Sequence, residues 1–226
     1  MKRFVEVERC PVPGGGGGEL ILYRRGDDFV VHVDGHELMG SRAHASEEQL
    51  AALGCAGLRG VPGARVLIGG LGMGYTVRAA LRALTDDARV DVAELVPAVV
   101  AWNRGVLAHL AGAPLTDPRV HVIEKDVAHV LKAAEASYDA ILLDVDNGPS
   151  ALTSPLNARL YDAAGLTRAT RALRPAGVLA VWSTSDDPAF TERLARAGFT
   201  TRLERPSARV GGGGRHVVWV ARRPAA

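Results

Sequence analysis

The sequence is poor in cysteine, in excess charge and in long apolar runs, and each shortage excludes a class of protein. Two cysteines, Cys10 and Cys55, in 226 residues form neither a disulfide framework nor a C-x-x-C pair, so we expect no thiol metal site. A formal net charge of +2 does not favour a nucleic-acid or anionic-membrane partner. No apolar run reaches the roughly 20 residues of a membrane helix, and Glu6 and Glu8 interrupt any signal-peptide core. We therefore expect a soluble, cytoplasmic protein.

The sequence does contain enough apolar residues, 47% of the total, to bury one large domain with a small appendage. From residue 65 onward strand-like and helix-like segments alternate, which is typical of an α/β fold with helices on both faces of a parallel sheet. We expect strands near 65–69, 89–94, 119–123, 138–144 and 177–182, and helices near 74–84, 97–110, 127–135, 155–173 and 188–197. Strands near 199–204 and 216–221, joined through glycines 211–214, predict a C-terminal antiparallel hairpin.

The N-terminal part predicts a separate appendage. A glycine run at 14–18 separates a short first segment from the rest, and alternating residues over 19–33 predict a β-hairpin. Ser46, followed three residues later by Gln49, is typical of a capping box at a helix start. We therefore predict residues 1–58 as a β-hairpin and gate helix and residues 59–226 as the main domain.

The most informative segment is Arg-Val-Leu-Ile-Gly-Gly-Leu-Gly-Met-Gly at 65–74. An apolar strand enters a turn with Gly69, Gly70, Gly72 and Gly74, and a helix follows at once. Glycine lets a ligand approach the backbone closely, and the N–H groups of the helix start then face that ligand. The segment predicts a nucleotide-cofactor site in a Rossmann-like fold.

Acidic residues follow the later strands, at the carboxyl ends where open parallel sheets bind ligands. Glu94 comes about twenty residues after the turn, which suits hydrogen bonds to ribose hydroxyls, although a surface acid also suits a strand end. Asp126 precedes the helix that starts at Val127, so it suits an N-cap as well as an adenine contact. Asp144 and Asp146 suit either binding and deprotonation of a cationic substrate or an Asx turn.

Several segments resemble the spermidine synthase (polyamine aminopropyltransferase) family, within the class I S-adenosylmethionine-dependent methyltransferase superfamily. They are the glycine turn with its strand, Val-Ala-Glu-Leu-Val-Pro-Ala-Val-Val at 92–100, Asp-Pro-Arg-Val-His-Val at 117–122, Tyr-Asp-Ala-Ile-Leu-Leu-Asp at 138–144 and Leu-Arg-Pro-Ala-Gly-Val-Leu at 173–179. The resemblance runs from about Glu19 to Ala221. It implies a seven-stranded methyltransferase sheet with a small N-terminal β-hairpin domain.

The resemblance also implies a cofactor and a role for each acid. Residues 59–226 would bind S-adenosylmethionine or its decarboxylated form, with no metal. Glu94 would bind the ribose, Asp126 beside Val127 would bind the adenine, and Asp144 would act as the acid near the accepting amine.

Three departures from the family pattern bear on the transferred group. The family's glycine loop has the sequence Gly-Gly-Gly-Asp-Gly-Gly, and its aspartate, which holds the aminopropyl end of the decarboxylated cofactor, corresponds to Gly72 here. A gate-helix tyrosine corresponds to Ser46, and residues 144–147 replace an Asp-Ser-Ser-Asp-Pro loop. Loss of the acid at position 72 removes the repulsion toward a carboxylate, so intact S-adenosylmethionine becomes the easier ligand.

These observations predict a group transferase that moves a methyl group from S-adenosylmethionine to a small amine or similar nucleophile. Asp144, with Asp146 beside it, would orient or deprotonate the acceptor. Aminopropyl transfer from the decarboxylated cofactor is the main alternative, and aminocarboxypropyl transfer is a third. A nicotinamide oxidoreductase would need a third glycine at Tyr75, and a non-catalytic scaffold would not need the intact turn and acids. The expected partner is a small-molecule amine, and a homodimer is one assembly open to the chain.

Overall fold

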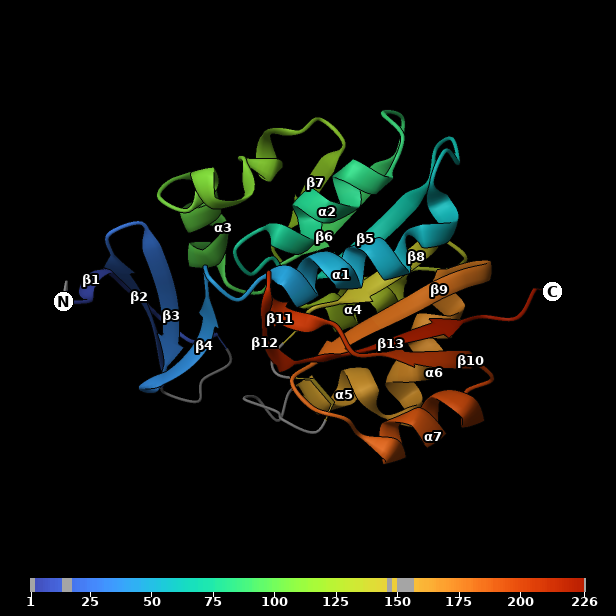
Figure 1. Ribbon diagram of the computed structural model, residues 1–226. Coiled ribbons are helices and arrows are strands. Elements are labelled where there is room, and N and C mark those ends of the chain that lie inside the picture. Colours follow the sequence, from blue (N-terminus) through green and yellow to red (C-terminus); the bar gives the residue numbers. More distant parts are fainter. Residues whose placement is uncertain (1–2, 14–17, 146–147, 150–156, 226) are drawn as a thin grey trace.

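The main unit is an α/β sandwich, and a smaller β-sheet lies beside it (Figure 1). The computed structural model describes residues 3–13, 18–145, 148–149 and 157–225. The glycines at 14–17 and the predicted catalytic residue Asp146 lie outside these residues. The main unit contains β5 (Arg65–Gly69), α2 (Tyr75–Ala83), β6 (Arg89–Ala93), α3 (Pro97–Arg104), β7 (Val120–Ile123), α4 (Val127–Ala133), β8 (Tyr138–Leu143), α5 (Ala158–Tyr161), α6 (Ala163–Ala172), β9 (Leu173–Ser183), α7 (Pro188–Arg196), β10 (Thr200–Glu204) and β13 (Val217–Arg222).

The main sheet has seven strands in the order β10-β13-β9-β8-β5-β6-β7. The strands from β7 to β9 in this order are parallel, while β13 pairs antiparallel with both β9 and β10. The expected α/β sheet with a C-terminal antiparallel hairpin is therefore confirmed. Because the chain leaves β5 toward β6 and later returns to its other side as β8, the carboxyl ends of β5 and β8 flank the point where parallel sheets bind ligands.

Helices cover both faces of the main sheet (Figure 1). Helices α1 (Ala45–Gly54), α2 and α3 lie on one side, and α4, α6 and α7 lie on the other. Side chains alternate along β5, with Val66 and Ile68 in the first buried cluster and Leu67 in the second. Trp102 of α3 lies in the first cluster and is 2% exposed. Within the described chain, no helix combines the length and apolar character that crossing a membrane requires.

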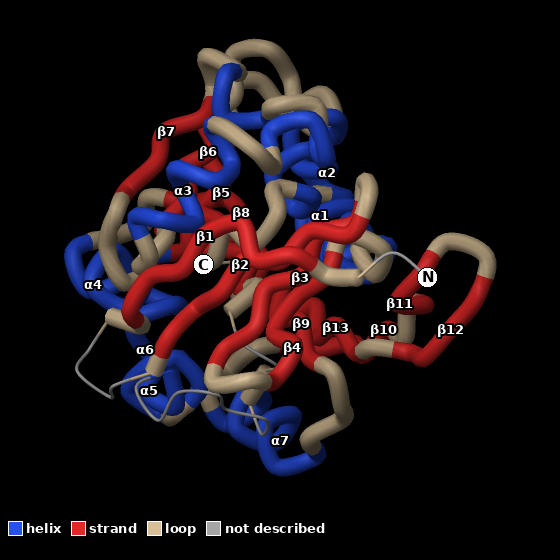
Figure 2. The backbone as a smooth tube through the Cα atoms, turned by 90° about the vertical axis from the view of Figure 1, so that its left-hand side faces the viewer, coloured by secondary structure: helices blue, strands red, loops and turns tan. Residues whose placement is uncertain are grey.

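The N-terminal appendage is a four-stranded antiparallel sheet of β1 (Val5–Pro11), β2 (Glu19–Arg25), β3 (Asp28–Val33) and β4 (His36–Gly40). Figure 2 shows it in front of the main sheet. The expected hairpin is β2–β3, but the first segment is not separate, because β1 pairs along β2. The strand β4 was not expected either, although the Asp34-Gly35 turn before it, with φ of 49° and 80°, is a hairpin signal.

Three helix and loop predictions need correction. The helix expected over 97–110 ends at Arg104, and a short 3₁₀ turn (Ala108–Ala111) follows. The helix expected near 155–173 is divided in its described part at Asp162, whose carboxylate accepts the Gly165 N–H at 2.6 Å and caps α6. The glycines at 211–214 are not a plain loop, because β11 (Ser207–Arg209) pairs with β12 (Gly212–Arg215).

Helix α1 (Ala45–Gly54) packs on α2 and β9 and carries a buried polar contact in place of the predicted capping box. Ser46 is fully buried inside the helix, and its Oγ accepts the indole N–H of Trp182 at 3.0 Å. The same Oγ forms a hydrogen bond with His216 Nδ1 at 2.8 Å, and burial lowers the pKa of His216. The hydroxyl thus forms hydrogen bonds with residues distant in the sequence and does not cap the helix. The division at 58/59 stays a prediction.

The first testable consequence concerns this contact. Ser46→Ala should lower the free energy of unfolding by about 1–3 kcal/mol, because it leaves buried donors and acceptors on Trp182 and His216 without a partner. Urea unfolding of the variant measures the loss, with Ser207→Ala on an exposed strand position as the matched control. Equal stability of the two variants would show that Ser46 makes no net contribution.

Candidate active site

A cavity of about 230 Å³ lies between the N-terminal sheet and the carboxyl ends of the parallel strands. Gly70 and Gly72 of the turn border it, and so does Val127 at the start of α4. The acids on its described lining come from four separate parts of the chain, namely Glu47, Glu94, Asp126 and Asp144. The fold therefore brings the glycine turn and three of the acids predicted from sequence to one cavity.

The turn after β5 packs directly on the end of β8. Gly70 has a φ of +87°, and a Cβ there would lie 2.2 Å from the backbone oxygen of Asp144, so only glycine fits. Gly72 has a φ of +54° with open space around it, since a Cβ would meet only the Met39 sulfur, at 3.9 Å. Gly69 ends β5 and Gly74 precedes α2, so these two shape the turn.

Glu94 fixes the glycine turn as well as lining the cavity. Its Oε2 accepts the Leu71 N–H at 2.9 Å and its Oε1 accepts the Val96 N–H at 2.8 Å. Burial raises the pKa of this carboxyl, while the backbone N–H groups act in the opposite direction. A carboxylate has about four acceptor sites, so with three backbone N–H donors, of Leu71, Leu95 and Val96, this one can still accept a hydrogen bond from a ligand.

Asp126 caps helix α4, as its position before Val127 predicted. Its Oδ1 accepts the Ala128 N–H at 2.7 Å, and its Oδ2 forms an ion pair with Arg159. The capping role leaves the carboxylate on the cavity lining, so capping and ligand contact are compatible here.

Asp144 and Glu47 place two carboxylates in the same cavity. Asp144 accepts the Thr76 hydroxyl at 2.6 Å through Oδ2, and burial raises its pKa to about 6. Burial and the negative charges of Asp144 and Glu48 raise the pKa of Glu47 well above its ordinary value. Two acids with raised pKa values beside each other favour a cation, which removes their mutual repulsion. In the described residues no group of three or more His, Cys, Asp or Glu side chains is arranged to hold a metal ion.

Glu47 is the site residue that sequence reasoning missed, because it was counted among the residues of a capping box. Its position next to Ser46, where the resemblance places a gate residue, was the signal that could have found it. The sequence could not tell which side of α1 meets the cavity, since that depends on how the helix packs on β9.

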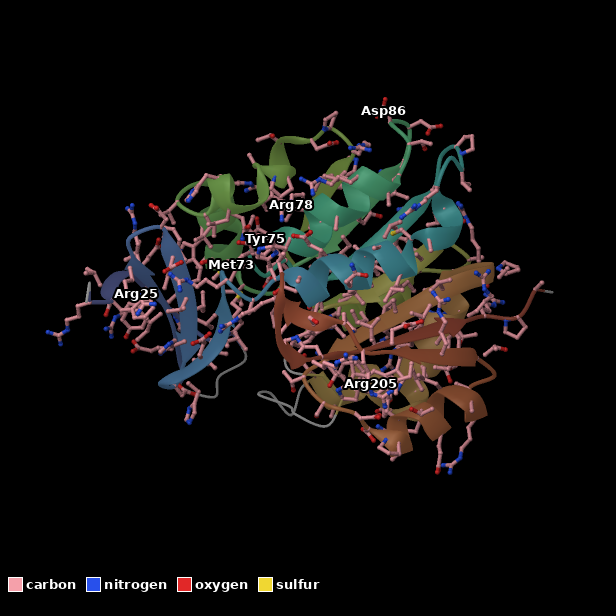
Figure 3. The ribbon with its side chains drawn as sticks, in the orientation of Figure 1. Arg25, Met73, Tyr75, Arg78, Asp86 and Arg205 are labelled. Atoms are coloured by element: carbon pink, nitrogen blue, oxygen red, sulfur yellow. The ribbon has the colours of Figure 1, made fainter. Side chains whose placement is uncertain are left out.

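A clamp of side chains holds α1 against α2 next to Glu47. Arg78 donates to Glu48 at 2.5 Å, and the His44 Nδ1 lies 2.8 Å from the same carboxylate oxygen. The His44 ring stacks on Tyr75 with 4.1 Å between the ring centroids. Figure 3 shows Tyr75 and Arg78 beside each other, near the N-terminal sheet.

Comparison with known proteins identifies the family. Residues 46–197 match the family model described as the spermine/spermidine synthase domain. The chain belongs to this family. A polyamine aminopropyltransferase of Mycobacterium tuberculosis (strain H37Rv) is 33% identical over 168 residues, 72% of this chain. Putrescine N-methyltransferase 3 of Nicotiana tabacum is 36% identical over 118 residues, 51% of this chain.

Solved structures show the same fold. Spermidine synthase from Thermotoga maritima superposes with a TM-score of 0.74 at 18% identity, covering 98% of this chain and 74% of the other. The match spans only 30% of the Mycobacterium tuberculosis protein and 29% of the tobacco enzyme. The family and the class I methyltransferase-like fold expected from the resemblance are confirmed.

The raised pKa of Asp144 predicts a pH-dependent stability. Folding raises this pKa from 3.8 to about 6, so the folded state holds the proton more tightly, and the unfolding free energy falls as pH rises through that interval. Between about pH 4 and pH 7, the unfolding free energy of the wild type should fall by about 2–3 kcal/mol more than that of Asp144→Asn. Urea unfolding across this range measures the difference.

The matched control for this experiment is Asp86→Asn, at an exposed position that Figure 3 shows in the loop after α2, at the opposite end of that helix from Tyr75. It should follow the wild-type pH dependence. If Asp144→Asn also shows the wild-type pH dependence, burial does not shift the pKa of the Asp144 carboxyl.

Proposed function

We propose that the chain transfers an aminopropyl group from decarboxylated S-adenosylmethionine to an amine. The observation that carries the proposal is the carboxylate pair Asp144 and Glu47 at one cavity beside the glycine turn. Carboxylates removed from water attract ammonium groups strongly, and the decarboxylated cofactor and the acceptor each carry one. The aminopropyltransferase names of relatives support the proposal, as does a fold neighbour described as spermidine synthase in complex with the transition state analogue AdoDATO.

The sequence analysis preferred methyl transfer to aminopropyl transfer, and this proposal reverses that preference. Methyl transfer was preferred because Gly72 stands where the family has an acid. Glu47 supplies a carboxylate to the same cavity from α1, so the missing acid in the turn no longer favours the intact cofactor.

The nucleoside site follows from the other acids. The turn offers backbone without side chains at Gly70 and Gly72, and the Glu94 carboxylate, 8% exposed, borders the same space. These groups fit a nucleoside thioether. We propose that Glu94 accepts the ribose hydroxyls and that Asp126, beside Val127, accepts the adenine amino group.

In the proposed reaction the residues of the site bind and orient the two substrates, and one of them accepts a proton. The sulfonium of the bound cofactor supplies an electrophilic carbon and a thioether leaving group. Thr76 orients the Asp144 carboxylate, which accepts the proton that the amine releases as its nitrogen forms the new C–N bond and the C–S bond electrons pass to sulfur. Glu47 holds the ammonium of the aminopropyl end. Such positioning supplies roughly 7–11 kcal/mol of the barrier, so the base need not be strong.

Methyl transfer from intact S-adenosylmethionine is the second candidate. The open space at Gly72 leaves room for the carboxylate of the intact cofactor. The putrescine N-methyltransferases among the relatives support this candidate.

The transferred group decides between the two candidates. With both cofactors and an amine supplied, mass spectrometry should find the aminopropyl product. Glu47→Gln should weaken binding of the decarboxylated cofactor by about tenfold or more relative to the intact one, because the lost carboxylate pairs with its ammonium. Competitive calorimetry measures this ratio, with Glu37→Gln on exposed β4 as the control. A product that carries only a methyl group would replace the proposal with methyl transfer.

The nucleoside site has its own test. Glu94→Ala should weaken binding of methylthioadenosine, a neutral nucleoside, by about 1.5–3 kcal/mol, the usual loss for hydrogen bonds to a charged group. Calorimetry gives the affinity, and the melting temperature shows whether the turn that Glu94 holds through Leu71 remains folded. Unchanged affinity in a folded variant would remove Glu94 from the ribose site.

A further inference from the structure

The turn after β5 lies between the two ends of the proposed site. In the main sheet β5 is the neighbour of both β8 and β6, and β7 follows β6. Asp144 follows β8, whereas Glu94 follows β6 and Asp126 follows β7. A molecule that reaches from the nucleoside acids to the reacting carboxylates therefore passes the turn, where Gly70 and Gly72 border the cavity.

Gly72 is the part of this turn that depends most on contacts from outside. Its φ is +54°, and a Cβ there would meet only the Met39 sulfur, at 3.9 Å. Within the described part of the chain, its N–H and its carbonyl form no hydrogen bond with another backbone group. Glycine adopts many backbone conformations at little cost, so the turn by itself does not fix this residue.

A fully buried amide on α3 forms the hydrogen bond that holds Gly72. Asn103 is 1% exposed, and its Nδ2 donates to the Gly72 oxygen at 2.9 Å. The same nitrogen donates to the Val99 oxygen, one helical turn earlier, at 2.9 Å. Both N–H groups of the amide are therefore engaged, which fixes the side chain and the direction of the Gly72 carbonyl. The helix also lies close to the end of the turn, because a Cβ at Gly74 would be 3.2 Å from the Asn103 Oδ1.

Loss of this donor would change one half of the turn and leave the other half in place. A buried carbonyl without a donor is costly, and the peptide unit of Gly72 is free to rotate toward another partner because nothing packs closely on it. Gly70 is held by its packing on the Asp144 oxygen, and Leu71 by its hydrogen bond to Glu94. The nucleoside end of the site therefore does not depend on this amide.

We propose that Asn103 is a positioning residue for the cofactor, which holds Gly72 so that the chain between the sulfonium and its charged end lies over the turn. The inference rests on the proposed function, because it concerns the cofactor of the same site. Asn103 itself does not border the cavity, so its effect passes through Gly72. The intact and the decarboxylated cofactor both carry such a chain, and the role is the same for each.

Two variants test this role through two ligands. Asn103→Leu removes both hydrogen bonds of the amide. It should weaken binding of the cofactor that wild type prefers by about tenfold or more, but binding of methylthioadenosine, which has no charged chain, by less than about threefold. Calorimetry gives both affinities, and the melting temperature shows that the variant is folded. Equal losses for the two ligands, or no loss for either, would make Asn103 purely structural and overturn the inference.

The second variant separates the contact with Gly72 from the contact within the helix. In Asn103→Ser the hydroxyl can donate to the Val99 oxygen four residues earlier, but it is too short to replace the amide at Gly72. This variant should show the same selective loss of the cofactor, and it serves as the test if Asn103→Leu does not fold. Wild-type affinity for the cofactor in Asn103→Ser would overturn the inference.

A control variant loses a hydrogen bond of the same kind at a distant place. The Trp219 indole N–H donates to the Thr191 hydroxyl at 2.8 Å, on the face of the sheet that α7 covers. Thr191→Val should lower the melting temperature without changing either affinity. A selective loss of cofactor binding in this control would show that lowered stability alone causes the effect, and would overturn the inference.

The same measurements separate this inference from the proposed function. The two affinities do not depend on the transferred group, so a methyl product would replace aminopropyl transfer and leave the inference in place. If wild type binds neither methylthioadenosine nor either cofactor, the proposed function fails and the inference fails with it.

Discussion

The site depends on the close contact between the turn after β5 and the end of β8. The Asp144 N–H donates to the Gly69 oxygen at 2.8 Å, and the absence of a side chain at Gly70 lets the Asp144 oxygen lie against the turn. This contact holds the proposed cofactor turn and the proposed proton acceptor at one place. Any side chain at position 70 would push the two strand ends apart and separate the two halves of the chemistry.

Helix α1 joins the appendage to this contact through three consecutive residues. Ser46 faces the core and holds Trp182 and His216, Glu47 borders the cavity, and Glu48 pairs with Arg78 of α2. Successive helical residues point about 100° apart, so one turn of helix serves three directions. The buried serine and the clamped glutamate fix the helix, and they thereby fix the carboxylate between them.

The cavity combines two opposite environments. At the reacting centre, burial raises the pKa values of Asp144 and Glu47, so the free protein bears a cost for ionising them, which a bound ammonium relieves. Next to them the N-terminal sheet offers apolar side chains such as Leu38 and Val33. The cavity thus joins an acidic region to an apolar one, and the two come from different parts of the fold.

The sequence by itself determined the parallel sheet, the glycine turn and the positions of Glu94, Asp126 and Asp144, because strand periodicity, glycine and strand-end acids are local patterns. It also predicted the N-cap role of Asp126, which needs only the helix that follows. Local patterns gave a wrong prediction where long-range packing determines the contacts. The hydroxyl of Ser46, for example, forms hydrogen bonds with residues far along the chain and does not cap the helix. Only the tertiary structure placed Glu47 beside Asp144 and the apolar sheet over both, because the face a helix or sheet presents depends on what it packs against.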